Sequence, residues 1–370
     1  MIKILFFLSS HKIGLSNLLS EQALYYKQLQ HLDFTFVAGE NEQEEGLRKR
    51  LETRNISYKI IHGLDEHNNF LNLIKEFKIY VNSVKPDMVH VQTNWQLVIA
   101  IVTKIFVSKK YKIFYTIHGY RNNYKYKSII ALWLIQILLF IFTDAIFAAS
   151  SMVFRKFSLV QKKLYILYLG VEEKFFIRSL PIAHEVESIK MIFPAQFREG
   201  KNQYALINTI DEYIRHTGDN SITLSLPGEG PLKDECMELC KNLNLENNII
   251  FHGQVTRETI IQHYESCNVA IMPSNSETFG HAIAEPFVLG MCVISRNTGI
   301  AMDVIENTRN GFIFETDEEL LNILINLNQN RSMIQNVANN AFAKRDIFKW
   351  TTLASQYQNF VLRTMSGEQH

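Results

Sequence analysis

The stretch CNVAIMPSNSETFGHAIAEPFVLGMCVIS, residues 267–295, has two short apolar runs on either side of a helix-length segment. NVAIMPS (268–274) and MCVISRN (291–297) are almost continuously apolar, as are strands that are buried on both faces. AIAEPFVLG (282–290) lies between them and predicts a helix. A strand, a helix and a second strand in this order predict a βαβ unit, and so a parallel sheet.

The same alternation of apolar runs and helical patterns continues over the whole chain. The helices predicted in the first half include residues 15–31, 68–84 and 95–107. The other predicted strands are KILFFL (3–8), DFTFVAG (33–39), DMVHVQ (87–92), KIFYTIHG (112–119), DAIFAAS (144–150), KMIFPAQ (190–196), SITLSLPG (221–228), NIIFHG (248–253) and GFIFE (311–315). Their number and spacing predict an α/β protein built from doubly wound sheets.

Length and charge divide the chain in two. At 370 residues it exceeds one ordinary core, and the polar stretch SLPIAHEVES (179–188) has the composition of a linker. Residues 1–190 carry a net charge of +9 and residues 191–370 one of −8. We expect two Rossmann-like domains, residues 1–180 and 181–345, that face each other across a cleft. A C-terminal helix in residues 346–370 would return to the first domain.

The basic first half indicates an anionic partner, either a phosphate-bearing acceptor or an acidic membrane surface. The alternative is that these charges only solvate helix faces. The four cysteines all lie in the second half without the spacing of a metal site, which favours a reducing cytoplasm. The apolar run in MIKILFFLSSHK (1–12) is too short for a signal peptide.

One long apolar stretch, IIALWLIQILLFIFT (129–143), contains no charged residue. A membrane-spanning helix needs about 20 apolar residues, so this segment predicts a buried core helix. Basic residues flank it on both sides, and docking on a membrane surface is therefore the alternative. They are Arg121, Lys125, Lys127, Arg155 and Lys156.

Charged and small residues follow the predicted strands of the second domain. Arg198 and Lys201 come after KMIFPAQ, where two cations would meet a diphosphate, unless this is simply a solvated loop. Gly228 and Gly230 surround Glu229 before a helix, which is a weak signal because many such turns need glycine.

The next two loops carry polar residues at the same edge of the sheet. IIFHGQV (249–255) places Gly253 and Gln254 where the backbone would lie close to a flat base. Thr278, Phe279 and Gly280 fall at a predicted helix N-terminus, which favours an anion or sugar oxygens. Glu277 just outside this helix and Glu285 about two turns into it would reach different parts of one ligand. The alternative is that the spacing of these two glutamates is a coincidence on an exposed helix.

In order and spacing, these pieces resemble the family-four retaining glycosyltransferases of the GT-B fold over nearly the whole chain. SNSETFGHAIAEPFVLGMCVIS (274–295) is similar to the E-x7-E segment of that family, and TGIAMDVIENTRNGFIF (298–314) to the stretch that follows. FYTIHG (114–119) resembles the strand that ends in the active-site histidine, here His118. DMVHVQ resembles a strand with two histidines, the second of which is Gln92 here.

The resemblance implies how a nucleotide-sugar would bind. Glu285 would hold the ribose hydroxyls, and Glu277 would lie by the donor sugar and its phosphates. Lys201 would neutralise the diphosphate leaving group, and His118 would touch the sugar from the opposite domain. The implied donor-binding residues are Arg198, Lys201, Gly228, Glu229, Gln254, Thr278, Phe279, Gly280 and Glu285; the implied catalytic residues are His118 and Glu277, with Gly14 in the N-terminal loop.

The sequence departs from the family pattern at several places. Gln196 stands where the family has an arginine, so Arg198 is a candidate to supply that charge. Ile13-Gly14 replaces a pair of glycines in the first loop. Leu169-Gly170-Val171 replaces Asn-Gly-Val. Pro286 removes a hydrogen bond from the helix after Glu285 and predicts a kink there.

The function implied by the resemblance is retaining transfer of a hexose or N-acetylhexosamine. The donor would be a nucleotide-sugar, with UDP favoured, and the acceptor a growing, lipid-linked surface glycan of the O-antigen or capsule type. No aspartates stand at i and i+2, so we expect no metal and no cofactor. We also expect a cytoplasmic protein without a nucleic-acid partner, with peripheral contact to the inner membrane face as an open alternative. Two other functions stay open: a nucleotide-sugar epimerase of the same architecture, and a non-catalytic transferase-like subunit.

Overall fold

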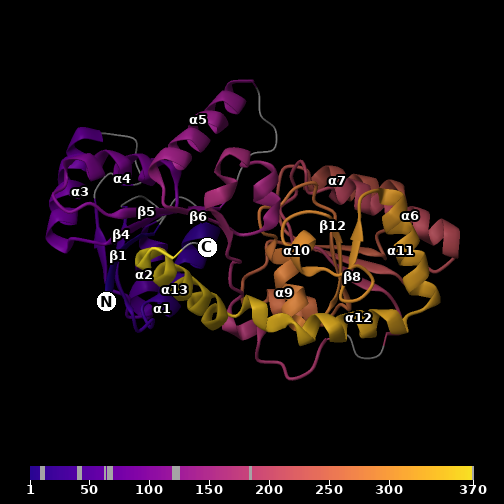
Figure 1. Ribbon diagram of the computed structural model, residues 1–370. Coiled ribbons are helices and arrows are strands. Elements are labelled where there is room, and N and C mark those ends of the chain that lie inside the picture. Colours follow the sequence, from indigo (N-terminus) through magenta and orange to yellow (C-terminus); the bar gives the residue numbers. More distant parts are fainter. Residues whose placement is uncertain are drawn as a thin grey trace. The chain divides into compact units, whose positions relative to one another are not determined.

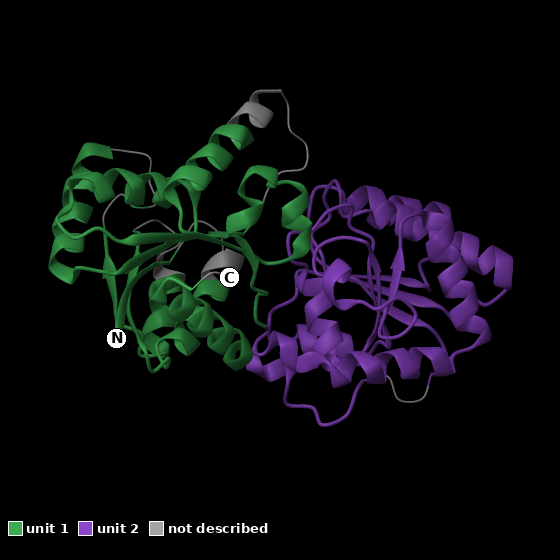
Figure 2. Ribbon diagram, in the orientation of Figure 1, with its two compact units in different colours: residues 1–170, 350–370 green, residues 171–349 purple. Residues whose placement is uncertain are grey.

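The computed structural model describes residues 1–8, 13–39, 44–61, 64, 70–118, 126–182 and 186–368, although the side chains of residues 13–16, 44–46 and 126–131 lie outside the description. It divides into two compact units (Figure 2). Unit 1 consists of residues 1–170 and 350–370, and unit 2 of residues 171–349. The first boundary follows Gly170, about ten residues before the boundary expected from composition, and the second follows Lys349.

Unit 1 contains a seven-stranded parallel sheet in the order β3-β2-β1-β4-β5-β6-β7 (Figure 1). Its strands are β1 (Ile2–Phe7), β2 (Leu32–Ala38), β3 (Tyr58–Ile60), β4 (Met88–Val91), β5 (Lys112–Ile117), β6 (Ala145–Ala148) and β7 (Leu164–Ile166). Its helices are α1 (Ile13–Tyr26), α2 (Glu44–Thr53), α3 (Phe70–Val84), α4 (Asn94–Phe106), α5 (Tyr126–Phe142), η1 (Ser151–Arg155), η2 (Ser158–Lys163) and α13 (Trp350–Ser366).

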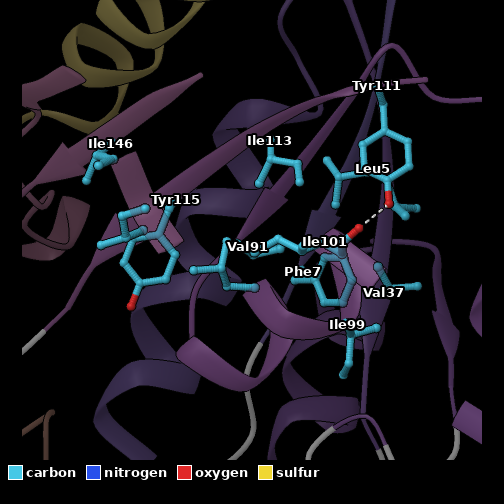
Figure 3. Packing of buried hydrophobic residues seen from close by; sticks show 14 of the residues in the cluster. Leu5, Phe7, Val37, Val91, Ile99, Ile101, Tyr111, Ile113, Tyr115 and Ile146 are labelled. Carbon is cyan, nitrogen blue, oxygen red and sulfur yellow. Dashed lines mark hydrogen bonds between the residues drawn. The ribbon is translucent and has the colours of Figure 1, made fainter. Parts of the chain in front are cut away.

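Apolar residues on both faces of this sheet are buried, which explains the almost continuously apolar strands. Leu5 and Phe7 of β1 face the core that is covered by α3, α4 and α5, part of which is drawn in Figure 3. Phe6, between them, faces the opposite core, to which α1, α2 and α13 contribute. Since successive side chains point to opposite faces, a strand buried on both sides loses the polar alternation of a surface strand.

Helix α13 joins unit 1 from the far end of the chain. Tyr357 on this helix is fully buried, and its hydroxyl lies 2.8 Å from Nδ1 of His90 on β4. Its ring stacks on Tyr26 of α1 with 4.4 Å between ring centroids. The core of unit 1 therefore includes side chains from residues more than 300 positions apart in the sequence.

Unit 2 repeats the same strand order with six parallel strands, β10-β9-β8-β11-β12-β13. Its strands are β8 (Lys190–Ile192), β9 (Thr223–Pro227), β10 (Ile249–Gly253), β11 (Val269–Met272), β12 (Cys292–Arg296) and β13 (Phe312–Phe314). Its helices are η3 (Glu173–Phe175), α6 (Gln203–Thr217), α7 (Lys233–Asn242), α8 (Ile260–Glu265), α9 (His281–Leu289), α10 (Ala301–Val304), α11 (Asp317–Gln329), α12 (Ser332–Ala343) and η4 (Arg345–Phe348).

Two doubly wound parallel sheets confirm the predicted fold class. In each sheet the strand order reverses once, between β1 and β4 in unit 1 and between β8 and β11 in unit 2. In open sheets of this kind, ligands bind at that reversal, outside the carboxyl ends of the strands. The loops after β8 and β11 are therefore the first place to look for a site in unit 2.

Candidate functional site

The loops after β8 and β11 are tied together by backbone and amide hydrogen bonds. The backbone N–H of Asn275 donates to the carbonyl of Gly200 at 2.9 Å. The side-chain amide of Asn202 donates to the carbonyl of Pro273 at 2.8 Å and to Oδ1 of Asn275 at 2.6 Å. Lys201 lies between Gly200 and Asn202, so its backbone is fixed against the second loop.

Lys201 and Glu277 meet where the strand order reverses. The ammonium group of Lys201 forms an ion pair with Oε1 of Glu277, and the two side chains are only 15% and 17% exposed. The backbone N–H of Glu277 donates to Oγ1 of Thr298 at 2.9 Å, which holds the loop on its other side. The sequence predicted that both residues bind one ligand, and the structure brings their side chains into contact. A held ammonium group in this position can stabilise negative charge on a phosphate.

Gly228 and Gly230 allow a third loop to lie directly on the loop after β8. The backbone N–H of Ala195 donates to Pro227 and that of Phe197 donates to Glu229, both at 3.0 Å. A Cβ atom on Gly228 would lie 2.0 Å from the carbonyl oxygen of Ala195. One on Gly230 would lie 2.3 Å from that of Phe197. The glycine pair is therefore explained by close backbone packing.

Glu229, between these glycines, makes local contacts. Its carboxylate forms an ion pair with Lys233 one helical turn later, at 2.7 Å. A Cβ on Gly253 would meet the same carboxylate at 3.0 Å. The carboxylate of Glu229 thus lies beside the Gly253 backbone, where the sequence suggested room for a flat base.

Helix α9 begins at His281, with Gly280 as its N-cap at a φ of 101°. Glu285 is consequently the fifth residue of the helix, and the expectation that it lies about two turns in was wrong. Pro286 lies inside the helix, which runs without a break from His281 to Leu289. Phe279, just before the cap, is 4% exposed, and its carbonyl accepts from the N–H of Ile300 at 2.9 Å. The segment before α9 is therefore packed against the protein as well as placed at a helix N-terminus.

Glu285 is buried and bonded on both of its oxygens. Arg257 donates to Oε1 at 2.6 Å, and the hydroxyl of Tyr264 donates to Oε2 at 3.2 Å. Burial and the adjacent Glu285 carboxylate raise the pKa of Tyr264 well above its usual value. Arg257 also binds Glu172, with 2.8 Å from Nε to Oε1. Arg257 and Tyr264 thus give each oxygen of Glu285 a hydrogen-bond donor.

Sequence reasoning missed Arg257, Tyr264 and Glu172 as parts of this cluster. Arg257 precedes α8 and Tyr264 lies on it, so their seven-residue spacing suits one helix face but gives no specific motif. Glu172 comes from the segment directly after the unit boundary. Only the packing of these segments together reveals the cluster.

Two predicted donor-binding residues stay at the surface. Arg198 is exposed and donates to the carbonyl of its neighbour Glu199 at 3.3 Å. Gln254 is also exposed. Both follow predicted strands and stand in loops at the carboxyl edge of the sheet. The carbonyl of Arg198 accepts from the backbone N–H of Lys201 at 3.2 Å, but neither the Arg198 nor the Gln254 side chain joins the described contacts of the Lys201 or Glu285 side chains.

In unit 1, His118 follows β5 and lies beside Gln92, which follows the neighbouring strand β4. Nε2 of His118 donates to Oε1 of Gln92 at 2.7 Å. Nε2 of Gln92 is buried and has no hydrogen-bond partner among the described residues. Gly14 is the second residue of α1, so the described backbone places it in a helix rather than in a loop. His118 and Gln92 thus form a polar pair at the carboxyl edge of this sheet.

Two neighbouring histidines in unit 1 are held neutral. Burial lowers the pKa of His118 to about 4. Burial, together with the nearby His118, lowers the pKa of His90 to about 3. The unfolded chain binds protons at these histidines near pH 6.5, whereas the native state does so only at lower pH.

We therefore expect unit 1 to lose stability as the pH falls from about 6.5 to 5. Each histidine adds at most about 1.4 kcal/mol per pH unit to this slope. All three tryptophans, Trp95, Trp133 and Trp350, lie in unit 1, so the urea midpoint from tryptophan fluorescence reports on it. His118→Gln should make the slope shallower. A midpoint that stays constant or rises over this range would contradict the assignment.

Comparison with known proteins now adds to this geometry. Residues 180–344 match the family model described as "Glycosyl transferases group 1". The uncharacterized glycosyltransferase MJ1607 of Methanocaldococcus jannaschii is 25% identical over 42% of each chain, so the match covers less than half of that relative's length. An uncharacterized 41.2 kDa protein in the cps region of Klebsiella pneumoniae is 24% identical over 75% of this chain and 80% of its own.

Solved structures with the same architecture cover nearly the whole chain. Alr3699/HepE of Anabaena, in complex with UDP, has a TM-score of 0.80 and 19% identity over 98% of this chain and all of its own. The same protein was also solved with UDP-glucose, at a TM-score of 0.76. A likeness at this identity establishes the fold. Residues 180–344 are therefore similar to the glycosyltransferase group 1 family, within a chain that has the GT-B fold.

Proposed function

We propose that this protein transfers a hexose or N-acetylhexosamine from a UDP-sugar to a growing, lipid-linked surface glycan, with retention at the anomeric carbon. The Lys201–Glu277 ion pair at the strand reversal of unit 2 carries the proposal. In the reaction, the bond between the anomeric carbon and the diphosphate oxygen breaks. The acceptor hydroxyl oxygen forms the new bond, and the products are UDP, the extended glycan and a proton.

The residues of the loops around this pair receive proposed roles. Lys201 stabilises the charge that develops on the departing diphosphate, so the reaction needs no metal ion. Glu277 lies by the donor sugar, and Glu285 binds the ribose hydroxyls beside Arg257. Backbone groups of Thr278, Phe279 and Gly280 face sugar or phosphate oxygens. His118 contacts the sugar in its neutral form.

The choice of donor and acceptor is supported by relatives and by charge. Alr3699/HepE binds UDP and UDP-glucose, and a relative is encoded in a cps region. A lipid-linked acceptor bears phosphate, which suits the basic first half of the chain. We also propose peripheral contact with the inner face of the membrane. Among the described residues, no helix is long and apolar enough to cross a bilayer.

A donor panel tests the proposal. Purified protein is incubated with UDP-, GDP- and dTDP-sugars and an extract of lipid-linked glycans, and nucleotide release and product mass are measured. We expect acceptor-dependent UDP release with one UDP-sugar. Conversion of a nucleotide-sugar without acceptor would favour an epimerase. Nucleotide binding without turnover over the whole panel would favour a non-catalytic subunit.

A further inference from the structure

Helix α5 has its polar residue buried and large apolar residues exposed, which is the reverse of an ordinary surface helix. Between residues 129 and 143 the only polar residues are Gln136, on the helix, and Thr143, directly after its last residue, and both are 2% exposed. Gln136 is used internally: it accepts from the N–H of Leu159 and donates to the carbonyl of Lys156, both at 3.3 Å. The outward side carries large apolar residues instead. They are Trp133, Leu134, Ile137, Phe140 and Ile141, with exposed fractions between 43% and 60%, and we call them the α5 face.

This arrangement corrects the sequence prediction for the segment. Residues 129–143 were expected to form a buried core helix, but only one side of α5 packs on the core of unit 1, through Leu132, Ile135, Leu139 and Phe142. The helix projects from the sheet in Figure 1. A helix that is apolar on all sides is normally buried in protein or in lipid, and here one side has no protein cover among the described residues.

The apolar surface continues onto the end of α4. Ile105 and Phe106 are 64% and 56% exposed. Ile105 lines a groove of about 540 Å³ together with Ile141 of the α5 face. Lys104, Lys110 and Lys163 also line this groove, together with one acidic residue, Asp144. Apolar side chains and cations thus occur together on one surface.

The region around the α5 face is strongly basic. Of residues 88–118 and 132–171, whose side chains the structure describes, eight are lysine or arginine and one, Asp144, is acidic; Asp87, just before this range, pairs with Lys109. The ammonium groups of Lys110 and Lys163 already donate hydrogen bonds to carbonyls at the C-terminal ends of α4 and α5. Arg155 and Lys162, in the segments that pack beside α5, are exposed and have no acidic partner among the described residues. These two cations are available to an anionic partner.

We propose that the α5 face is a docking surface for an anionic lipid bilayer, into which α5 inserts its outer side while lying along the interface. An apolar face in a basic surround has the composition of an interfacial helix, with aromatic residues at headgroup depth and cations near the phosphates. The excess of cations over acids in this region favours lipid phosphates over a mixed-charge protein surface. This inference deepens the proposed function, because it would hold the enzyme where a lipid-linked acceptor lies.

Vesicle flotation tests this surface without using sugar transfer, so its outcome is independent of the proposed function. The wild-type chain should float with vesicles of phosphatidylcholine and phosphatidylglycerol in equal parts, and much less with phosphatidylcholine alone. The double variant Leu134→Gln and Ile141→Gln should lower the partition coefficient about tenfold or more, since two apolar side chains no longer enter the lipid. Both positions are exposed, so the fold is unaffected by the change.

Matched variants separate the apolar and the charged contributions. Ile177→Gln with Leu180→Gln makes the same chemical change at two exposed positions of unit 2, 78% and 61% exposed, and should float like the wild type. Arg155→Glu with Lys162→Glu should lose the dependence on phosphatidylglycerol. Trp133 should show a blue-shifted emission on vesicle binding, which Trp133→Phe removes.

Three outcomes would overturn the proposal. The first is that the wild-type chain floats with neither kind of vesicle. The second is that the α5 variant floats as well as the wild type. The third is a wild-type dimer in sedimentation velocity that the α5 variant abolishes, without vesicle binding, because the face would then belong to a second copy of the chain.

Discussion

Replacing Lys201 with alanine is expected to lower kcat for acceptor-dependent UDP release by about 10²–10³, with a smaller change in KM. The ammonium group lies in a mostly buried pair with Glu277, so the charge that it would place near the proposed diphosphate is little screened by water. The loss should fall on kcat because charge on the leaving group develops in the transition state. Steady-state kinetics with the donor identified by the panel measures both parameters.

Arg198→Ala is the matched control for this prediction. Its guanidinium group is exposed and donates to the neighbouring Glu199 carbonyl, so we expect a rise in KM of only a few fold. Glu277→Gln keeps the size of the side chain but removes its charge, and it should also reduce kcat strongly. If Arg198→Ala lost more activity than Lys201→Ala, Arg198 would be the cation that replaces the arginine absent at Gln196. Normal turnover in the Glu277 variant would remove that residue from the proposed site.

Gly228→Ala is expected to destabilise unit 2 by roughly 3 kcal/mol or more. Its φ of 151° is unfavourable for any residue with a Cβ, and the new atom would lie 2.0 Å from the carbonyl oxygen of Ala195. The Cβ is fixed to the backbone at position 228 and the oxygen of Ala195 is itself a backbone atom, so the rotation of a side chain cannot relieve this contact. Urea unfolding followed by far-UV circular dichroism measures the loss, while tryptophan fluorescence follows unit 1 separately.

Gly218→Ala is the control that separates the destabilisation caused by steric crowding from that caused by a positive φ. Its φ is also positive, at 70°, but nothing lies within 4 Å of the position a Cβ would take. We expect this control to cost only about 1 kcal/mol. Equal losses for the two variants would mean that close packing of the loops after β8 and β9 contributes nothing. Gly228→Ala should also weaken donor binding, since the same loop backbone supports Lys201.

The fold was largely predictable because its strands are buried on both faces. Continuous apolar runs such as KILFFL and NVAIMPS mark strands directly, and the strand order then follows from the doubly wound architecture. The strands absent from the prediction, β3 and β7, have three residues each and lie at sheet edges. Runs this short carry too few apolar residues to be distinguished from loops.

The site was predictable where residues follow strands in sequence. Lys201 and Glu277 follow strands of unit 2 and His118 follows a strand of unit 1, so each sheet places its own residues at its carboxyl edge. Contacts from other segments were not predictable, and Arg257 on Glu285 is the main example. Arg198 and Gln254 follow strands as well, but their side chains turn outward, which depends on loop conformation rather than on spacing.

The sequence alone also does not determine whether one side of an apolar helix is exposed. IIALWLIQILLFIFT has almost the same composition as a buried helix, and nothing in it marks which side faces the core. A polar residue on a helix is normally expected outside, but Gln136 is buried. In the structure its amide is needed inside to bond the backbone at Lys156 and Leu159.

The return of α13 to unit 1 has a consequence for the order of events on the ribosome. Unit 2 is encoded as one uninterrupted segment, whereas unit 1 needs residues from both ends of the chain. When residue 170 leaves the exit tunnel, His90, Tyr26 and Phe147 still lack the aromatic ring of Tyr357 that covers them. The later-synthesised unit can therefore finish folding first, and the earlier one must wait, with part of its core open, until residues 350–366 have been synthesised.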